Sequence, residues 1–77
     1  MNYNSLVYFA KLAELEHYTK AAQALYISQP SLSYAIAKLE EELGLPLFEK
    51  DGRNVRLTKY GSVFYEYVSN GLTTINN

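Results

Sequence analysis

The sequence predicts a mainly α-helical fold in which three helices precede a two-stranded hairpin and a long helix follows it. Apolar residues recur at three- and four-residue spacing in several segments, which is typical of amphipathic helices. Asp51-Gly52 lies between two short segments with strand character, and Asp-Gly is a common hairpin turn. Pro30 and Gly44 stand where the third helix is expected to begin and to end.

Length and composition limit what the chain can do. Its 77 residues contain no cysteine and are 48% hydrophobic, which suits one small core and no second domain. No segment resembles a signal peptide or approaches the span of about 20 apolar residues that crosses a bilayer, so we expect a cytoplasmic protein without membrane contact. With His17 as the one histidine, we expect no metal site, no cofactor and no enzymatic activity.

The first two helices are predicted from residue spacing. From Ser5 to about Glu16, one face is apolar and comprises Leu6, Phe9, Leu12 and Ala13. After a break at residues 16–19, a short second helix begins near His17 or Thr19. It contains Ala21, Ala22 and Leu25, and its small alanines would let a neighbouring helix approach closely.

A third helix is predicted to begin after Ser28, which can cap it, and to run to about Leu43. Its buried face is expected to consist of Leu32, Ile36, Leu39 and Leu43. The opposite face collects short, mostly uncharged side chains, namely Gln29, Pro30, Ser31, Ser33, Tyr34, Ala37 and Lys38. Amides and hydroxyls at the start of this face can reach base edges in a DNA major groove, and the helix N-terminus favours phosphate.

Residues 47–58 are predicted to form a hairpin in which the segments LFEK and NVRLT flank the turn DGR. Lys50, Arg53 and Arg56 would make it a basic ribbon beside the third helix, suited to contacts with the DNA backbone or the minor groove. Three helices and such a hairpin make a winged helix-turn-helix with a three-helix core and a two-stranded wing.

Thr58 can cap a last helix that begins at Lys59. Its apolar stripe comprises Phe64, Tyr67, Val68, Leu72 and Ile75, and a helix this apolar is not expected to stand alone. We therefore divide the chain into a winged helix-turn-helix at 1–58 and a last helix at 59–77.

The charges are unevenly distributed, although their sum is −1. Residues 17–39 carry only Lys20 and Lys38, and residues 50–60 carry four basic residues and one acidic residue. Residues 40–49 carry four glutamates, and the triplet at 40–42 is predicted to be a solvated face that points away from DNA. This separation is compatible with phosphate binding on one side of the molecule.

Four segments carry a resemblance to a known family: YFAKLAE, YTKAAQALYISQPSLS, LEEELGLPLF and RNVRLTKYG. In combination they resemble the DNA-binding domain of the LysR-type transcriptional regulators over essentially the whole chain. The resemblance implies DNA-contact roles for Ser28, Gln29, Pro30, Ser33 and Tyr34. Tyr34 departs from the family pattern, which more often has arginine there, so a phenol replaces a charge-assisted contact.

The resemblance also implies that residues 1–58 are a DNA-binding domain and that residues 59–77 are a linker or dimerisation helix, which pairs between the two subunits of a homodimer. Family members continue into a larger effector-sensing domain, so we expect this chain to be a DNA-binding fragment or a natural truncation. A small-molecule effector is expected only where such a C-terminal domain exists.

Each assignment has a simpler alternative. Ser28 and Thr58 can be helix caps alone, Gln29 and Ser33 idle polar residues, Lys50, Arg53 and Arg56 solvated charges, and His17 a structural or surface histidine. Two function classes follow: sequence-specific binding of double-stranded DNA for transcription regulation, and a winged-helix protein-interaction module without specific DNA binding.

Overall fold

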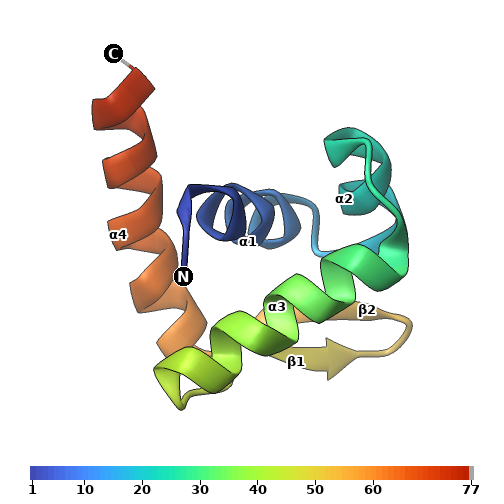
Figure 1. Cartoon of the computed structure of the whole chain (residues 1–77). Coiled ribbons are helices and arrows are strands. Elements are labelled where there is room, and N and C mark those ends of the chain that lie inside the picture. The colour runs from blue at the N-terminus through green and yellow to red at the C-terminus, as the bar shows by residue number, and fades with distance from the viewer. Residues whose placement is uncertain (77) are drawn as a thin grey trace.

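The computed structural model describes residues 1–76 of the chain, and the side chains of residues 1–73. Its elements are α1 Tyr3–Leu15, α2 Tyr18–Leu25, α3 Gln29–Leu43, β1 Phe48–Asp51, β2 Asn54–Leu57 and α4 Lys59–Asn76. Helix α1 packs against α2, α3 and α4, and Figure 1 shows α2 and α4 on opposite sides of it. The predicted winged helix-turn-helix fold is confirmed. Within residues 1–76, none of the helices is both long and apolar enough to cross a membrane.

Polar caps account for the bounds of the first two helices. The Asn2 side chain accepts the Ser5 N–H at 2.8 Å, so α1 begins two residues before the predicted Ser5. Nδ1 of His17 accepts the Lys20 N–H at 3.1 Å, which starts α2 at Tyr18 and gives His17 a structural role.

The third helix has the predicted bounds. The Ser28 side chain accepts the Ser31 N–H at 3.1 Å, and Pro30 lies in the first turn, where its missing N–H costs no helical hydrogen bond. Gly44 ends the helix at φ 71°, in the left-handed region that glycine adopts without steric cost.

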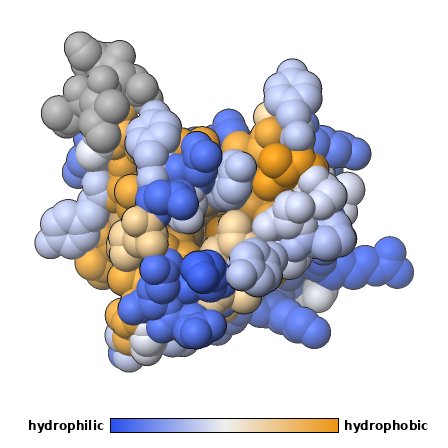
Figure 2. Space-filling view, in the orientation of Figure 1, coloured by the Kyte–Doolittle hydropathy of each residue, from blue (hydrophilic) through white to orange (hydrophobic). Residues whose placement is uncertain are grey.

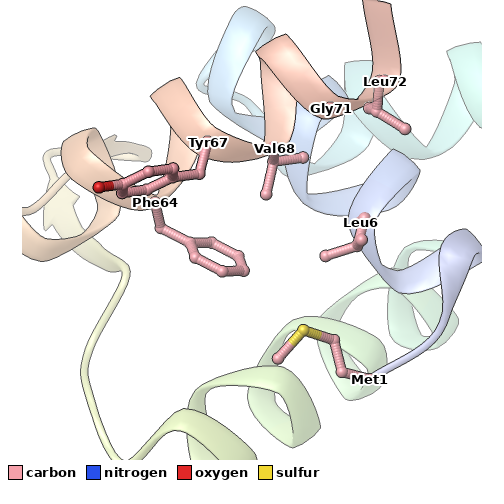
Figure 3. A pocket seen from close by; sticks show the side chains of 7 residues that line it. All are labelled: Met1, Leu6, Phe64, Tyr67, Val68, Gly71 and Leu72. Carbon is pink, nitrogen blue, oxygen red and sulfur yellow. The ribbon is translucent and has the colours of Figure 1, made fainter. Parts of the chain in front are cut away.

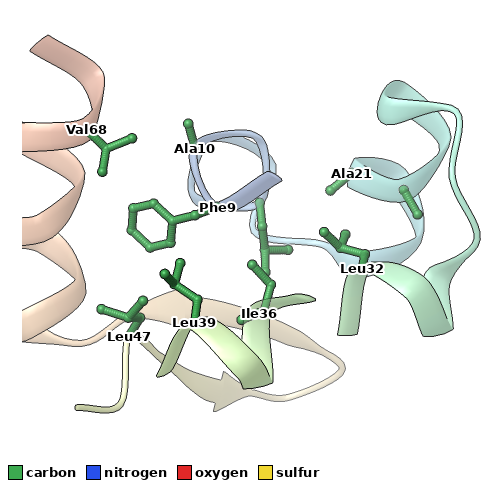
Figure 4. Packing of buried hydrophobic residues seen from close by; sticks show 10 residues of the cluster. Phe9, Ala10, Ala21, Leu32, Ile36, Leu39, Leu47 and Val68 are labelled. Carbon is green, nitrogen blue, oxygen red and sulfur yellow. The ribbon is translucent and has the colours of Figure 1, made fainter. Parts of the chain in front are cut away.

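Phe9 on α1 lies at the centre of the core (Figure 4). Its ring centroid is 5.4 Å from that of Phe48 and 5.0 Å from that of Phe64, so α1 is joined to the hairpin and to α4. The fully buried large side chains are Phe9, Leu12, Leu32, Ile36, Leu39 and Leu47. Leu6, Leu25 and Phe48 are half-buried at its edge. The predicted buried face of α3 is confirmed at Leu32, Ile36 and Leu39, and Leu43 is half-buried.

The wing is a single antiparallel pair in which Phe48 lies opposite Leu57 and Asp51 opposite Asn54. Gly52 in the turn has φ 65°. Strand β1 begins one residue later than predicted. The Leu47 side chain is buried in the core, and the Leu47 carbonyl accepts the Thr58 N–H at 3.0 Å beside the ladder.

Glu40 corrects the prediction that residues 40–42 form one solvated face. Its Oε2 accepts the backbone N–H groups of Leu47 at 2.7 Å and Phe48 at 3.2 Å, and its side chain is half-buried. Glu41 is exposed, as predicted, and Glu42 accepts a hydrogen bond from the Met1 ammonium group at 2.6 Å. Glu40 therefore fixes the start of the wing to α3.

Helix α4 begins with the predicted cap. Thr58 Oγ1 accepts the Gly61 N–H at 3.0 Å and donates to the Pro46 carbonyl at 2.6 Å. Gly61 is buried against the backbone of Leu47, and a Cβ at this position would overlap the Leu47 carbonyl oxygen. The first turn of α4 is thus held at backbone distance from the start of the wing.

Candidate nucleic-acid interface

The outward face of α3 contains the residues predicted for DNA contact. Gln29, Pro30, Ser31, Tyr34, Ala37 and Lys38 are exposed there, and Ser33 is half-buried. Leu32, Ile36 and Leu39 anchor the opposite side in the core. In Figure 2 the surface over the N-terminal half of α3 is pale, whereas deep blue residues gather over its C-terminal half.

Hydrogen bonds within the chain divide these residues into two groups. Ser28 Oγ accepts the Ser31 N–H and donates to Ser31 Oγ at 2.7 Å, so both hydroxyls take part in capping the helix. Gln29 and Tyr34 make no side-chain hydrogen bond to any residue that the structure describes. Their amide and hydroxyl groups therefore face solvent with their hydrogen-bonding capacity free.

The electrostatic surroundings of this face are favourable for phosphate. Residues 17–39 contain no acidic residue, and both of their lysines, Lys20 and Lys38, are exposed. Of the following glutamates, Glu40 is directed to the wing. The hydrogen bond from the Met1 ammonium group lowers the pKa of Glu42, and this charge pair lies at the far end of α3.

The wing is less basic than the sequence suggests. Arg56 Nε lies 3.1 Å from Glu49 Oε1, and the two residues are direct partners in the ladder. Lys50 and Arg53 are exposed and have no ion-pair partner among residues 1–73. Figure 1 places the hairpin loop and the N-terminal end of α3 toward the same side of the molecule. The predicted basic ribbon thus reduces to Lys50 and Arg53, with a partly compensated Arg56.

Two exposed residues near the site were not assigned to it from the sequence. Lys20 lies in the first turn of α2, and its charge was visible in the sequence without a place on a surface. Tyr26 ends α2 at φ 59° and is 96% exposed. A helix end was expected near Tyr26, but a left-handed tyrosine is uncommon and no local motif predicts one.

The residues of the apolar stripe on α4, which were predicted to form the dimer interface, differ in exposure. Val68 is 6% exposed and already covered within its own chain, whereas Tyr67 is 75% exposed. Two apolar hollows flank Tyr67. The first, of about 240 Å³, is lined by Met1, Leu6, Phe64, Tyr67, Val68, Gly71 and Leu72 (Figure 3). The second, of about 280 Å³, is lined by Leu45, Tyr60, Val63, Phe64 and Tyr67. The side chain of Ile75 lies outside the described residues.

Among the described residues, no group of three or more histidine, aspartate or glutamate side chains is arranged to hold a metal ion.

Comparison with known proteins identifies a family. Residues 3–62 match the family described as bacterial regulatory helix-turn-helix protein, lysR family. The HTH-type transcriptional regulator BudR of Klebsiella aerogenes is 52% identical over 66 residues, which are 86% of this chain and 46% of that protein. The HTH-type transcriptional regulator BenM of Acinetobacter baylyi is 42% identical over 76 residues, which are 99% of this chain and 25% of BenM.

Solved structures have the same fold. The complex of the BenM DBD with benA site 1 DNA matches 99% of this chain and 88% of that chain, with a TM-score of 0.94 and 42% identity. The complex of the CbnR DBD with DNA matches 99% of this chain and 87% of that chain, with a TM-score of 0.92 and 33% identity. This chain spans less than half the length of the BudR and BenM proteins. The match over residues 3–62 and these structural likenesses show that the chain belongs to the lysR family of bacterial regulatory helix-turn-helix proteins.

Proposed function

We propose that this chain binds double-stranded DNA in a sequence-specific manner for transcription regulation, and that it is not an enzyme. The observation that carries the proposal is the exposed outer face of the first three turns of α3, which has no acidic residue, in a chain that matches DNA complexes of the BenM and CbnR domains. An α-helix fits the B-DNA major groove, and the buried face of α3 leaves its outer face available.

The exposed residues of α3 have different roles in the proposed complex. Gln29 has a free amide that can bond adenine N6 and N7 together, and it lies at the open end of the helix. Ser33 and Tyr34 follow on the groove side, and Lys38 reaches the backbone. Ser28 and Ser31 cap the helix and direct its N–H groups toward phosphate.

The wing supplies contacts that position the protein without selecting a sequence. Arg53 at its turn and Lys50 beside it, neither of which has an ion-pair partner among residues 1–73, are cations that suit phosphate or a narrow minor groove. Arg56 contributes less, because Glu49 compensates part of its charge. On this view α3 provides specificity and the wing provides affinity.

The proposed assembly is a homodimer that pairs through α4. Tyr67, Phe64 and Leu72 border the first apolar hollow, and a partner helix would cover them. Ile75 is retained in the proposed interface from its place in the stripe. A pair of chains would bind two half-sites. The place of action would be the cytoplasm, where bacterial DNA lies, and any small-molecule effector would act through a further C-terminal domain.

The proposal is tested by selecting bound sequences from a random duplex pool and then titrating salt. Sequence-specific binding predicts an enriched motif, with an affinity that falls steeply as salt rises, because bound phosphates release counterions. A scrambled duplex of equal length and composition is the control. An unenriched pool together with salt-insensitive flow-through on a DNA column would favour the protein-interaction module instead.

A further inference from the structure

Tyr34 has the largest side chain on the outer face of α3, and it contributes little to the core. It is 69% exposed, and its hydroxyl has no partner among the described residues. Pro30 lies one turn before it and Ala37 one turn after it, at the spacing that places side chains on one helix face. Both are exposed and neither has a polar side-chain group. Pro30, Tyr34 and Ala37 are called the apolar row below.

The apolar row differs from its surroundings in chemistry. Lys38 follows it, but α3 contains no arginine, and residues 17–39 contain no acidic side chain. In a major groove, arginine or lysine reads guanine most often, carboxylates accept from cytosine, and apolar groups contact the 5-methyl group of thymine. With Lys38 assigned to the DNA backbone, the other side chains on the first three turns of α3 match A·T pairs better than G·C pairs.

We propose that the apolar row reads thymine methyl groups and that Tyr34 is its specificity-determining residue. This inference rests on the proposed function and makes it more specific. Gln29 would bond an adenine edge at the start of the helix, and the Tyr34 ring would cover a thymine methyl about one turn further along. The target is thus a half-site in which A·T pairs lie under the first three turns of α3.

The test replaces single thymines by deoxyuridine in a duplex selected by the wild-type chain. This exchange removes one methyl group and leaves base pairing unchanged. In each half-site, deoxyuridine at one position should weaken binding of the chain to the duplex about fourfold. This ratio corresponds to about 0.8 kcal/mol, the contribution of one buried methylene-sized group. Tyr34→Phe keeps the ring and should keep this methyl dependence. Tyr34→Ala removes the ring and should abolish it at the same position.

Each contrary outcome has a distinct meaning. If the wild-type chain bound the selected duplex specifically but tolerated deoxyuridine everywhere, methyl reading would be wrong and the proposed function would stand. If Tyr34→Ala kept the full methyl dependence, the role of Tyr34 would be wrong. If selected and scrambled duplexes bound equally before any exchange, both proposals would fail. Thermal melts of both variants check folding, which an exposed position is expected to tolerate.

Discussion

Glu40 Oε2 on α3 accepts the backbone N–H of Leu47 at 2.7 Å, across the loop that leads from α3 into the wing. The same oxygen accepts the Phe48 N–H at 3.2 Å. Glu40→Ala leaves two partly buried backbone donors without their carboxylate, and hydrogen bonds to charged groups contribute about 1.5–3 kcal/mol. We expect the free energy of unfolding to fall by that order in urea titrations. Glu41→Ala is the matched control at an exposed neighbour and should have little effect.

The two glycines of α4 should respond oppositely to the same substitution. A Cβ on Gly61 would overlap the Leu47 carbonyl oxygen, so Gly61→Ala must displace α4 or the start of the wing, at a cost of about 1–3 kcal/mol. At Gly71, no atom of the described side chains lies within 4 Å of the corresponding position. Gly71→Ala should therefore stabilise the helix by about 0.5–1 kcal/mol. Thermal melts of the two variants decide the question, and equal shifts of Tm would contradict the close contact at Gly61.

Tyr18 gives the stability of the chain an alkaline dependence. Burial raises the pKa of its phenol above the ordinary value of 10.0, and the negative charge of Glu40 raises it further. The folded state therefore favours the neutral phenol. Its contribution to stability is complete below about pH 10 and is lost as pH rises through the folded pKa.

Between pH 8 and pH 11, the free energy of unfolding should therefore fall less in Tyr18→Phe than in the wild type. Tyr26→Phe, at a side chain that is 96% exposed, is the control and should follow the wild-type curve. Parallel losses in the wild type and in Tyr18→Phe would show that this phenol does not contribute.

Gln29 and Arg53 separate specific reading from general affinity. Gln29→Ala should cost about 1–3 kcal/mol on a selected site and little on scrambled DNA, because a bidentate base contact is lost. Arg53→Ala should weaken binding to both duplexes and lower the salt slope by about one for each protomer. Salt titrations of both variants on both duplexes provide the measurement. If Gln29→Ala weakened binding to both duplexes equally and Arg53→Ala changed neither the affinity nor the salt slope, the roles assigned to α3 and to the wing would both be wrong.

Pairing through α4 is best tested at Tyr67, because Val68 is needed in the core of its own chain. Tyr67→Glu places a charge between the two apolar hollows and should give folded monomers in sedimentation experiments. Ser62→Glu, another exposed position on α4, is the matched control and should leave the assembly unchanged. A wild-type chain that stays monomeric at high micromolar concentration would contradict pairing through α4.

Most of the fold could be predicted because its signals are local. The capping and breaking effects of Ser28, Pro30, Gly44 and Thr58 act within one helical turn, and the observed bounds of α3 and the start of α4 follow from them. Glu40 could not be predicted in this way, because its partners lie seven and eight residues away and depend on how the loop folds back. A run of three glutamates looks solvated in any sequence.

Val68 shows a second limit of prediction from the sequence. A stripe on a helix indicates that its residues are covered, but not whether the cover comes from the same chain or from a partner. The structure covers Val68 from within the chain and leaves Tyr67 exposed. For the nucleic-acid interface, helix periodicity predicted which α3 residues are exposed. Their base contacts, which depend on the bound DNA, stay predictions.

The contact between Gly61 and Leu47 has a mechanical consequence. Helix α4 is held at its first turn by close backbone contact with Leu47, and it also packs against α1, so both contacts set its direction relative to the rest of the molecule. Its 18 residues, at about 1.5 Å each, form one continuous helix about 27 Å long. In the proposed dimer, a change of about 10° in the crossing angle of the two α4 helices would move the winged helix-turn-helix domains at their ends by about 5 Å. The crossing angle of the two α4 helices would then set the distance between the two recognition helices. A change in that angle would therefore change the spacing of DNA half-sites that the dimer can bind.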